Sequence, residues 1–167
     1  MNIKRWFRHL FMPPRAWRRA FPQATLAAIE AAIRASETRH GGEIRFVIEN
    51  SLAPGQVWRG MRGRERALDV FSRLRVWDTE HNSGVLIYLL LADHDIEIVA
   101  DRGIAARGEQ GAWEQVAQTM EAAFRAGEFE RGALAGIGRV SDLLAAHFPP
   151  TGNNPDELAN RPVILGR

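Results

Sequence analysis

The longest unbroken run of apolar residues, 85–91, lies near the middle of the chain and predicts a β-strand that is buried on both faces. Residues 92–95 have the composition of a turn. Residues 96–101 then alternate between two faces, and one face is apolar, with Ile96, Ile98 and Ala100. We expect an antiparallel hairpin, which brings Asp101 close to Ser83 and Gly84 at the start of the first strand.

A third strand and several helices are expected around this hairpin. Residues 43–49 alternate like a strand, with Ile44, Phe46 and Ile48 on one face, and residues 50–63 are expected to form a loop. Helical spacing recurs in four stripes: Leu26, Ile29 and Ile33; Leu68, Phe71 and Leu74; Trp113, Val116, Met120 and Phe124; and Phe129, Ala133, Ile137, Val140 and Leu144. Because a helix separates strand 43–49 from strand 85–91, these two strands are expected to be parallel, joined by a right-handed crossover.

The first eleven residues form an amphipathic pattern. The apolar face consists of Ile3, Trp6, Phe7, Leu10 and Phe11, and the basic residues Lys4, Arg5 and Arg8 lie away from it. A short basic helix of this kind is typical of peripheral membrane contact, where cations meet anionic headgroups, and all eight residues are predicted to contact the membrane. In the alternative interpretation, the same apolar face packs on this protein's own domain or on a second copy.

Charge and composition restrict the class of protein. Six basic residues and no acidic one lie in residues 1–20, whereas the remainder has 16 basic and 20 acidic residues, so nucleic-acid binding is not expected. The chain has no cysteine, and it contains no apolar run long enough to span a bilayer and no export signal. We therefore expect a cytoplasmic protein, peripheral on the inner membrane, with an arm at 1–20, a domain at 21–150 and a tail at 151–167 whose residues 163–165 pack on the core.

Polar residues from distant parts of the chain are expected to meet at one end of the sheet. The predicted topology brings Glu43, Asp78, Asn82 and Asp101 together, and oxygen ligands of this kind suit Ca²⁺ or Mg²⁺. In the alternative interpretation, Asp101 caps a turn, Glu43 pairs with an arginine such as Arg102, and Asn82 bonds loop backbone. Ligands of open α/β sheets usually bind at the other end, which here carries Asn50 and Asp93.

Three segments carry a resemblance to a known family: GEIRFVIE, VWDTEHNSGVLIYLLLADHDIEIVADRGI and GEFERGALAGI. The pattern from about residue 22 to 149 resembles the TPM domain family, whose members are associated with the thylakoid lumen, photosystems or membrane modulation. The resemblance implies an α/β fold, an α/β/α sandwich with a mixed sheet of about four strands flanked by helices. The sequence departs from the family at residues 82–84, where Asn-Ser-Gly replaces the more usual Asn-Asn-Gly and one side-chain oxygen ligand changes.

The resemblance implies two functions. The first is a non-enzymatic module that is attached to the membrane, binds a divalent cation and assists the maintenance of a membrane protein or complex. The alternative is an acid phosphatase-like hydrolase that uses the acidic cluster. In that case Asp101 serves in catalysis and the adjacent Arg102 clamps the phosphate.

Overall fold

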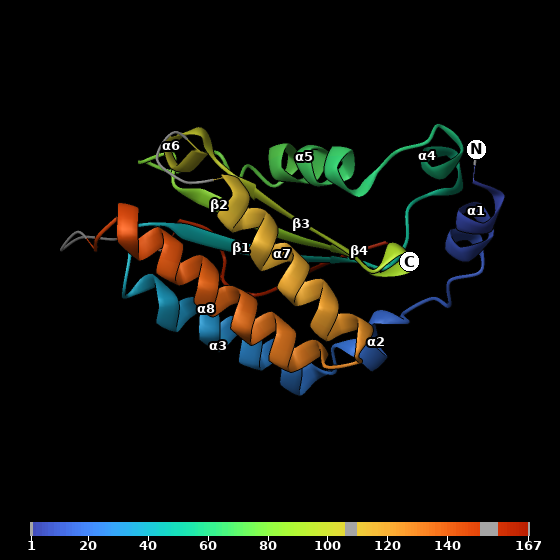
Figure 1. Cartoon of the computed structure of the whole chain (residues 1–167), viewed down its shortest axis with the longest axis horizontal. Coiled ribbons are helices and arrows are strands. Elements are labelled where there is room, and N and C mark those ends of the chain that lie inside the picture. Colours follow the sequence, from blue (N-terminus) through green and yellow to red (C-terminus); the bar gives the residue numbers. More distant parts are fainter. Residues whose placement is uncertain (1, 106–109, 151–156, 167) are drawn as a thin grey trace.

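Four strands form one mixed sheet in the computed structural model, which describes residues 2–105, 110–150 and 157–166. The strands are β1 (Glu43–Glu49), β2 (Gly84–Leu90), β3 (Asp95–Ala100) and β4 (Val163–Leu165), in the order β3-β2-β1-β4. Helices flank the sheet on both faces (Figure 1). The predicted α/β/α sandwich with a mixed four-stranded sheet is confirmed.

The crossover and the hairpin both form as predicted. β1 and β2 are parallel with Glu43 opposite Gly84, and β2 and β3 are antiparallel with Val85 opposite Ala100. The hairpin turn is a short 3₁₀ helix, Leu91–Asp93, followed by His94 in the left-handed conformation at φ 53°. The predicted loop 50–63 contains a short helix, α4 (Pro54–Trp58), and the next helix, α5 (Gly63–Arg73), ends one residue before Leu74, the last residue of the predicted stripe. Arg75 has a positive φ of 52°, which a continuing helix cannot accommodate.

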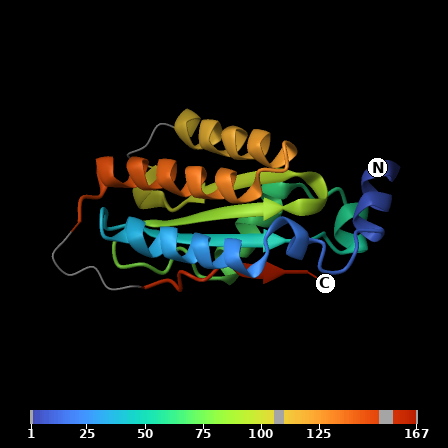
Figure 2. The same cartoon turned by 90° about the horizontal axis from the view of Figure 1, so that it is seen from below.

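Alternation along the strands divides the core into two layers. α3 (Gln23–Glu37), α7 (Gln110–Arg125) and α8 (Phe129–His147) cover the face that includes Ile44, Ile87 and Ile98. α5 covers the other face, with Val47, Tyr88 and Val99. The predicted faces of β1 and β3 are therefore confirmed, and Figure 2 shows α3, α7 and α8 together on one side of the sheet.

A buried ionic network lies in the layer under α5. The Tyr88 hydroxyl donates to Glu49 Oε2 at 2.6 Å, and the Arg66 guanidinium binds both oxygens of Glu49, with Nε to Oε2 at 2.8 Å and Nη2 to Oε1 at 2.9 Å. Burial and the charge of Glu49 raise the pKa of Tyr88, so this phenol stays protonated. The network fixes α5 to the centre of the sheet.

The two terminal segments pack against the domain. The N-terminal segment forms α1 (Ile3–Leu10) and α2 (Trp17–Ala20), and the C-terminal segment supplies β4, which pairs in parallel with β1, with Val47 opposite Val163. Both lie at one end of the sheet, and α6 (Arg102–Ala105) lies at the other (Figure 1). Each end of the sheet therefore carries one of the predicted groups of functional residues.

Candidate functional site

α1 is held on the domain by its polar residues. Asp93, in the β2–β3 turn, accepts a hydrogen bond from Arg5 Nε at 2.9 Å and forms an ion pair with Arg8, and its Oδ1 lies 3.1 Å from His9 Nε2. The buried His9 also accepts a hydrogen bond at Nδ1 from the backbone N–H of Leu52 at 3.0 Å. Since Nδ1 is an acceptor, the proton of the neutral ring lies on Nε2, toward Asp93.

These contacts determine the charge of Asp93. Burial opposes ionisation, but hydrogen bonds from His9, Arg5 and Arg8 outweigh it and hold the pKa of Asp93 well below the ordinary carboxyl range. Asp93 is therefore ionised at neutral pH and provides the negative charge around which the basic arm is arranged.

The apolar side chains of α1 face outward as a result. Phe11 is 71% exposed, Ile3 57%, Phe7 47% and Leu10 41%, and Phe7 and Phe11 stack with ring centroids 5.8 Å apart. We call these four side chains the α1 apolar face. α4, which contacts α1, exposes Trp58 by 63%. Of the eight residues predicted to contact a membrane, Arg5 and Trp6 instead lie against the domain, and Lys4 and Arg8 are exposed.

Asn50 connects the segment between α1 and α2 to the sheet. Its side chain accepts from the Trp17 N–H at 3.2 Å and donates to the Pro13 carbonyl at 3.1 Å, and its backbone bonds to Leu165 and Ala92. Asn50 follows β1 at the carboxyl end of the parallel strands, the usual place for a ligand in open α/β sheets. In this protein the arm occupies that place.

Glu43 and Asp101 lie at the opposite end of the sheet, on either side of Gly84. Glu43 is opposite Gly84 in the register of β1 and β2, and the Asp101 N–H donates to the Gly84 carbonyl at 2.9 Å. A Cβ added at Gly84 would lie 1.9 Å from the Val76 carbonyl oxygen. The Val76 carbonyl therefore packs directly on Gly84, between the two acidic residues. Only glycine permits this approach.

Three of the four predicted metal ligands bond to protein groups, and the fourth, Asp78, is exposed. Glu43 Oε2 accepts from the Leu158 N–H at 3.1 Å, so it anchors the C-terminal tail, and Asp78 is exposed. Asp101 Oδ1 accepts from the Arg102 N–H at 2.7 Å, and Arg102 Nε donates to Asn82 Oδ1 at 3.2 Å. Within the described ranges, no three His, Asp or Glu side chains lie close enough to share a metal ion.

The second carboxylate oxygen of Asp101 is placed differently from the first. Asp101 Oδ2 is buried and, among the described residues, makes no hydrogen bond. Asp101 accepts a hydrogen bond from the next backbone N–H, as the alternative interpretation predicted when it made Asp101 a turn cap. Glu43 bonds to the backbone of the C-terminal tail. The phosphate clamp proposed for the hydrolase, Arg102, binds Asn82 through its side chain. A carboxylate oxygen of this kind can accept a hard cation.

Sequence reasoning missed the anchoring roles of Asp93, His9 and Asn50. A signal was present, because the arm carries six basic residues and no acid, so a docked arm needs an acidic partner on the domain. Asp93 is an acidic residue that directly follows the central strand, at the end of the sheet where partners collect.

Comparisons with known proteins agree with this architecture. The model of the TPM domain matches residues 18–143. The NMR structure of the BA42 protein from the psychrophilic bacterium Bizionia argentinensis is similar with a TM-score of 0.74 and 30% identity, covering 84% of this chain and 92% of that one. The solution NMR structure of the N-terminal domain of a P. gingivalis protein has a TM-score of 0.61 and 18% identity, covering 77% and 81%.

The comparison with curated proteins yields no match. In the described part of the chain, no helix has both the length and the apolarity needed to cross a bilayer. The family model covers well over half of the chain, from α2 through most of α8. The chain therefore belongs to the TPM domain family.

Proposed function

We propose that this protein is a non-enzymatic TPM module that attaches peripherally to an anionic membrane surface through α1 and assists the maintenance of a membrane protein or complex there. The orientation of α1 carries the proposal. An amphipathic helix on a globular domain normally buries its apolar stripe, whereas here the polar residues Arg5, Arg8 and His9 contact the domain and the apolar face is exposed.

The free-energy terms favour such contact. Each large side chain of the α1 apolar face gains about 1.5–3 kcal/mol if an interface buries it fully. A nearby basic residue adds about 1 kcal/mol at an anionic surface, and the exposed Lys4 is available for this. An isolated helix of this length is unstable in water, but the contacts of Asp93 and Leu52 already hold α1 in place, which lowers the cost of ordering it.

Sedimentation with vesicles tests this proposal. We expect binding to phosphatidylcholine vesicles that contain phosphatidylglycerol, weaker binding in high salt, and a blue shift of tryptophan emission. The double variant Phe7→Ser/Phe11→Ser removes the exposed aromatic pair and should abolish binding. Leu68→Ser is the matched control, since Leu68 is 48% exposed on α5, away from α1.

The same variants distinguish a membrane from a second copy. If the wild-type protein is dimeric by sedimentation velocity without vesicles, and Phe7→Ser/Phe11→Ser is monomeric, the α1 apolar face is a dimer contact and the membrane proposal is wrong. Binding to vesicles by a monomer supports it. The inner face of the cytoplasmic membrane is the proposed location, because its surface is anionic and the arm is basic.

A divalent cation, Ca²⁺ or Mg²⁺, bound near Asp101 is the second part of the proposal. Support comes from the buried Asp101 Oδ2, and from the Asn82 amide oxygen, which Arg102 links to Asp101 by bonding both residues. Binding requires Arg102 to leave Asn82. Calcium should then raise the melting temperature of the wild-type protein but not that of Asp101→Asn. The absence of a shift and of binding heat at millimolar calcium would remove this part only.

A further inference from the structure

The outer edge of β3 has backbone groups that no strand of the described residues pairs. β3 is the last strand of the sheet in the described part of the chain. The Asp101 N–H bonds to the Gly84 carbonyl, and in an antiparallel ladder this places residues 95, 97 and 99 in the pairs that bond to β2. The N–H and C=O groups of Ile96, Ile98 and Ala100 therefore point outward.

Side chains hold two of these outward groups. Arg64 Nη1, from α5, donates to the Ile98 carbonyl at 2.7 Å, and the Ile96 N–H donates to Glu121 Oε1, on α7, at 3.3 Å. Both partners are long side chains at the rim of the edge, and Arg64 is exposed. They satisfy the backbone as a neighbouring strand would, and they can rotate away without unfolding either helix.

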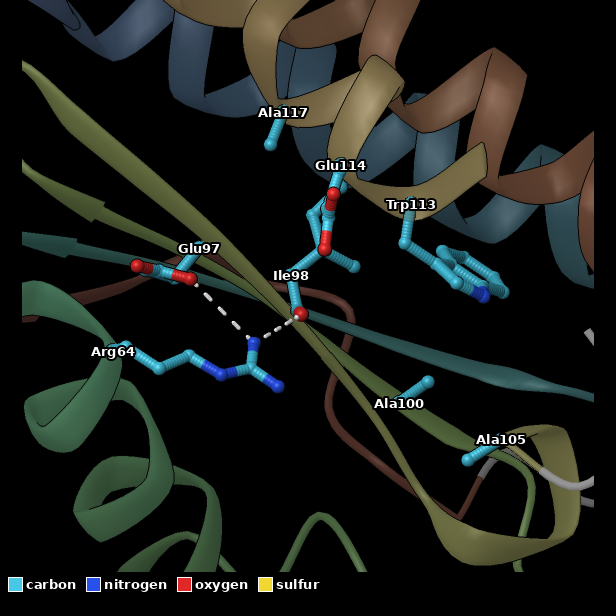
Figure 3. Close-up of a pocket in the computed structure, with 8 residues that line it drawn as sticks. All are labelled: Arg64, Glu97, Ile98, Ala100, Ala105, Trp113, Glu114 and Ala117. Atoms are coloured by element: carbon cyan, nitrogen blue, oxygen red, sulfur yellow. Dashed lines mark hydrogen bonds and ion pairs between the residues drawn. The ribbon is translucent and has the colours of Figure 1, made fainter. Parts of the chain in front are cut away.

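A cavity of about 360 Å³ lies along the same edge. Figure 3 shows β3 between α5 and α7, with Arg64 and Glu97 on one side and Trp113 and Ala117 on the other. The volume is within the range of small-ligand pockets and leaves room for a large apolar side chain.

The two faces of β3 give this edge a chemical pattern. Ile96 and Ile98 point toward the α7 layer, whereas Asp95 and Glu97 point toward α5. Burial and the neighbouring Asp95 raise the pKa of Glu97, since Arg64 compensates only in part. Burial, together with Glu121 and Asp93, raises the pKa of Asp95. Asp95 and Glu97 thus place two carboxylates on this side of β3, where Arg64 pairs with Glu97 and Arg62 lies close by.

We propose that the outer edge of β3 and the adjoining cavity bind an extended basic segment of a partner protein, which adds to the sheet as a fifth strand. Its backbone takes the places of Arg64 and Glu121 at Ile98 and Ile96. Because side chains alternate along a strand, its apolar residues enter the cavity beside Trp113 while its Lys or Arg residues pair with Glu97. The segment is therefore recognised by an alternation of basic and apolar residues.

An array of capped hexapeptides tests this surface. Lys or Arg alternates with Val, Leu, Phe or Trp in one set, and Glu replaces the basic residues in a second set. Binding peptides from the basic set are titrated into ¹⁵N-labelled protein. We expect saturable shifts at the amides of Ile98 and Ala100 and at the Trp113 indole, and no binding by the acidic set. Methylating the peptide nitrogens that face β3 should abolish binding, because those nitrogens then cannot donate.

Variants of side chains outside the apolar core test the surface without removing core packing. Glu97→Gln should weaken binding by about 2- to 5-fold, as expected for one cross-strand charge pair. Arg64→Ala should strengthen it, because it frees the Ile98 carbonyl. Glu30→Gln, on the far helix α3, is the matched control and should change nothing.

Three results would overturn the proposal. The first is that no peptide of the basic set binds at millimolar concentration. The second is that the N-methylated peptides bind as well as the others, which would show adsorption by charge alone. The third is that the shifts map away from β3, α5 and α7.

Discussion

His9 and Asp93 are 84 residues apart in the sequence, yet His9 Nε2 lies 3.1 Å from Asp93 Oδ1. This contact, with those of Arg5 and Arg8, fixes α1 at the carboxyl end of the parallel strands. It also explains why the apolar side of α1 faces outward, because the basic side is required at Asp93.

Asp93→Asn should loosen α1. The variant removes the charge that three side chains share, and we expect it to lower the free energy of unfolding by about 1.5–3 kcal/mol, as for hydrogen bonds to a charged group. Hydrogen exchange at the amides of α1 should rise at the same time. Asp142→Asn breaks the exposed pair with Arg39 and should change stability by no more than about 1 kcal/mol. Unchanged exchange in Asp93→Asn would show that α1 is held by other contacts.

The effect of Asp93→Asn should depend on pH. The pKa of Asp93 is held below its ordinary value of 3.8, so the stabilisation is fully present above that pH and is lost as the pH falls toward the lowered pKa. The difference in free energy of unfolding between the wild-type protein and Asp93→Asn should therefore shrink below about pH 4. Urea titrations at several pH values measure this difference.

Arg66→Ala should be strongly destabilising. Removal of the guanidinium leaves the buried carboxylate of Glu49 with only the Tyr88 hydroxyl, and breaking a buried pair in this way costs about 3–5 kcal/mol. Arg73→Ala, on the exposed side of the same helix, should cost no more than about 1 kcal/mol. Equal losses in urea denaturation would show that the buried network does not determine how α5 packs.

Gly84→Ala should destabilise the fold because the new Cβ meets the Val76 carbonyl oxygen at 1.9 Å. We expect a loss of about 3 kcal/mol, the upper end for an overpacked site. Gly138→Ala is the control, since nothing lies within 4 Å of the added Cβ in α8, and it should stabilise the protein by about 0.5–1 kcal/mol. Thermal melts of both variants check the pair, and a neutral Gly84→Ala would mean that the 74–83 segment yields easily.

The central parts of the fold could be predicted because hydrophobic periodicity reports burial directly. The run 85–91, the alternation in 96–101 and the stripes of the long helices each identify an element and its inner face. The pairing of β4 had no comparable signal, since three residues at the end of a polar tail show no period.

The sites were harder to predict than the fold. Periodicity shows which residues of α1 share a face, but not which face meets the domain, and the pairing with Asp93 reverses the usual orientation. The predicted strand register correctly places Glu43 and Asp101 next to Gly84. The Leu158 N–H that bonds to Glu43 and the Val76 carbonyl that packs on Gly84 belong to other segments of the chain. Backbone contacts of this kind leave no pattern in the sequence.

Purified protein should show no substantial hydrolysis of p-nitrophenyl phosphate, with or without Ca²⁺ or Mg²⁺. The physical reason is that Asp101 is buried and caps the first turn of α6, and that in the cation-free protein the Arg102 guanidinium binds Asn82. Neither group is placed to clamp and attack a phosphate ester. Robust turnover that Asp101→Asn abolishes would contradict the proposed function and favour the hydrolase.

Removal of residues 1–14 should abolish vesicle binding but leave the domain folded. The sheet and the helices that cover it lie outside this segment, so far-ultraviolet circular dichroism and a cooperative melt should persist. The melting temperature should fall by about 5–10 °C, because the truncation uncovers the apolar surface under Trp6 and Met12 and leaves Asp93 without its partners. Phe7→Ser/Phe11→Ser should lose vesicle binding without this fall, since both rings are exposed. If the truncated protein unfolds or precipitates while the double variant still binds vesicles, α1 is a part of the core and the membrane assignment is wrong.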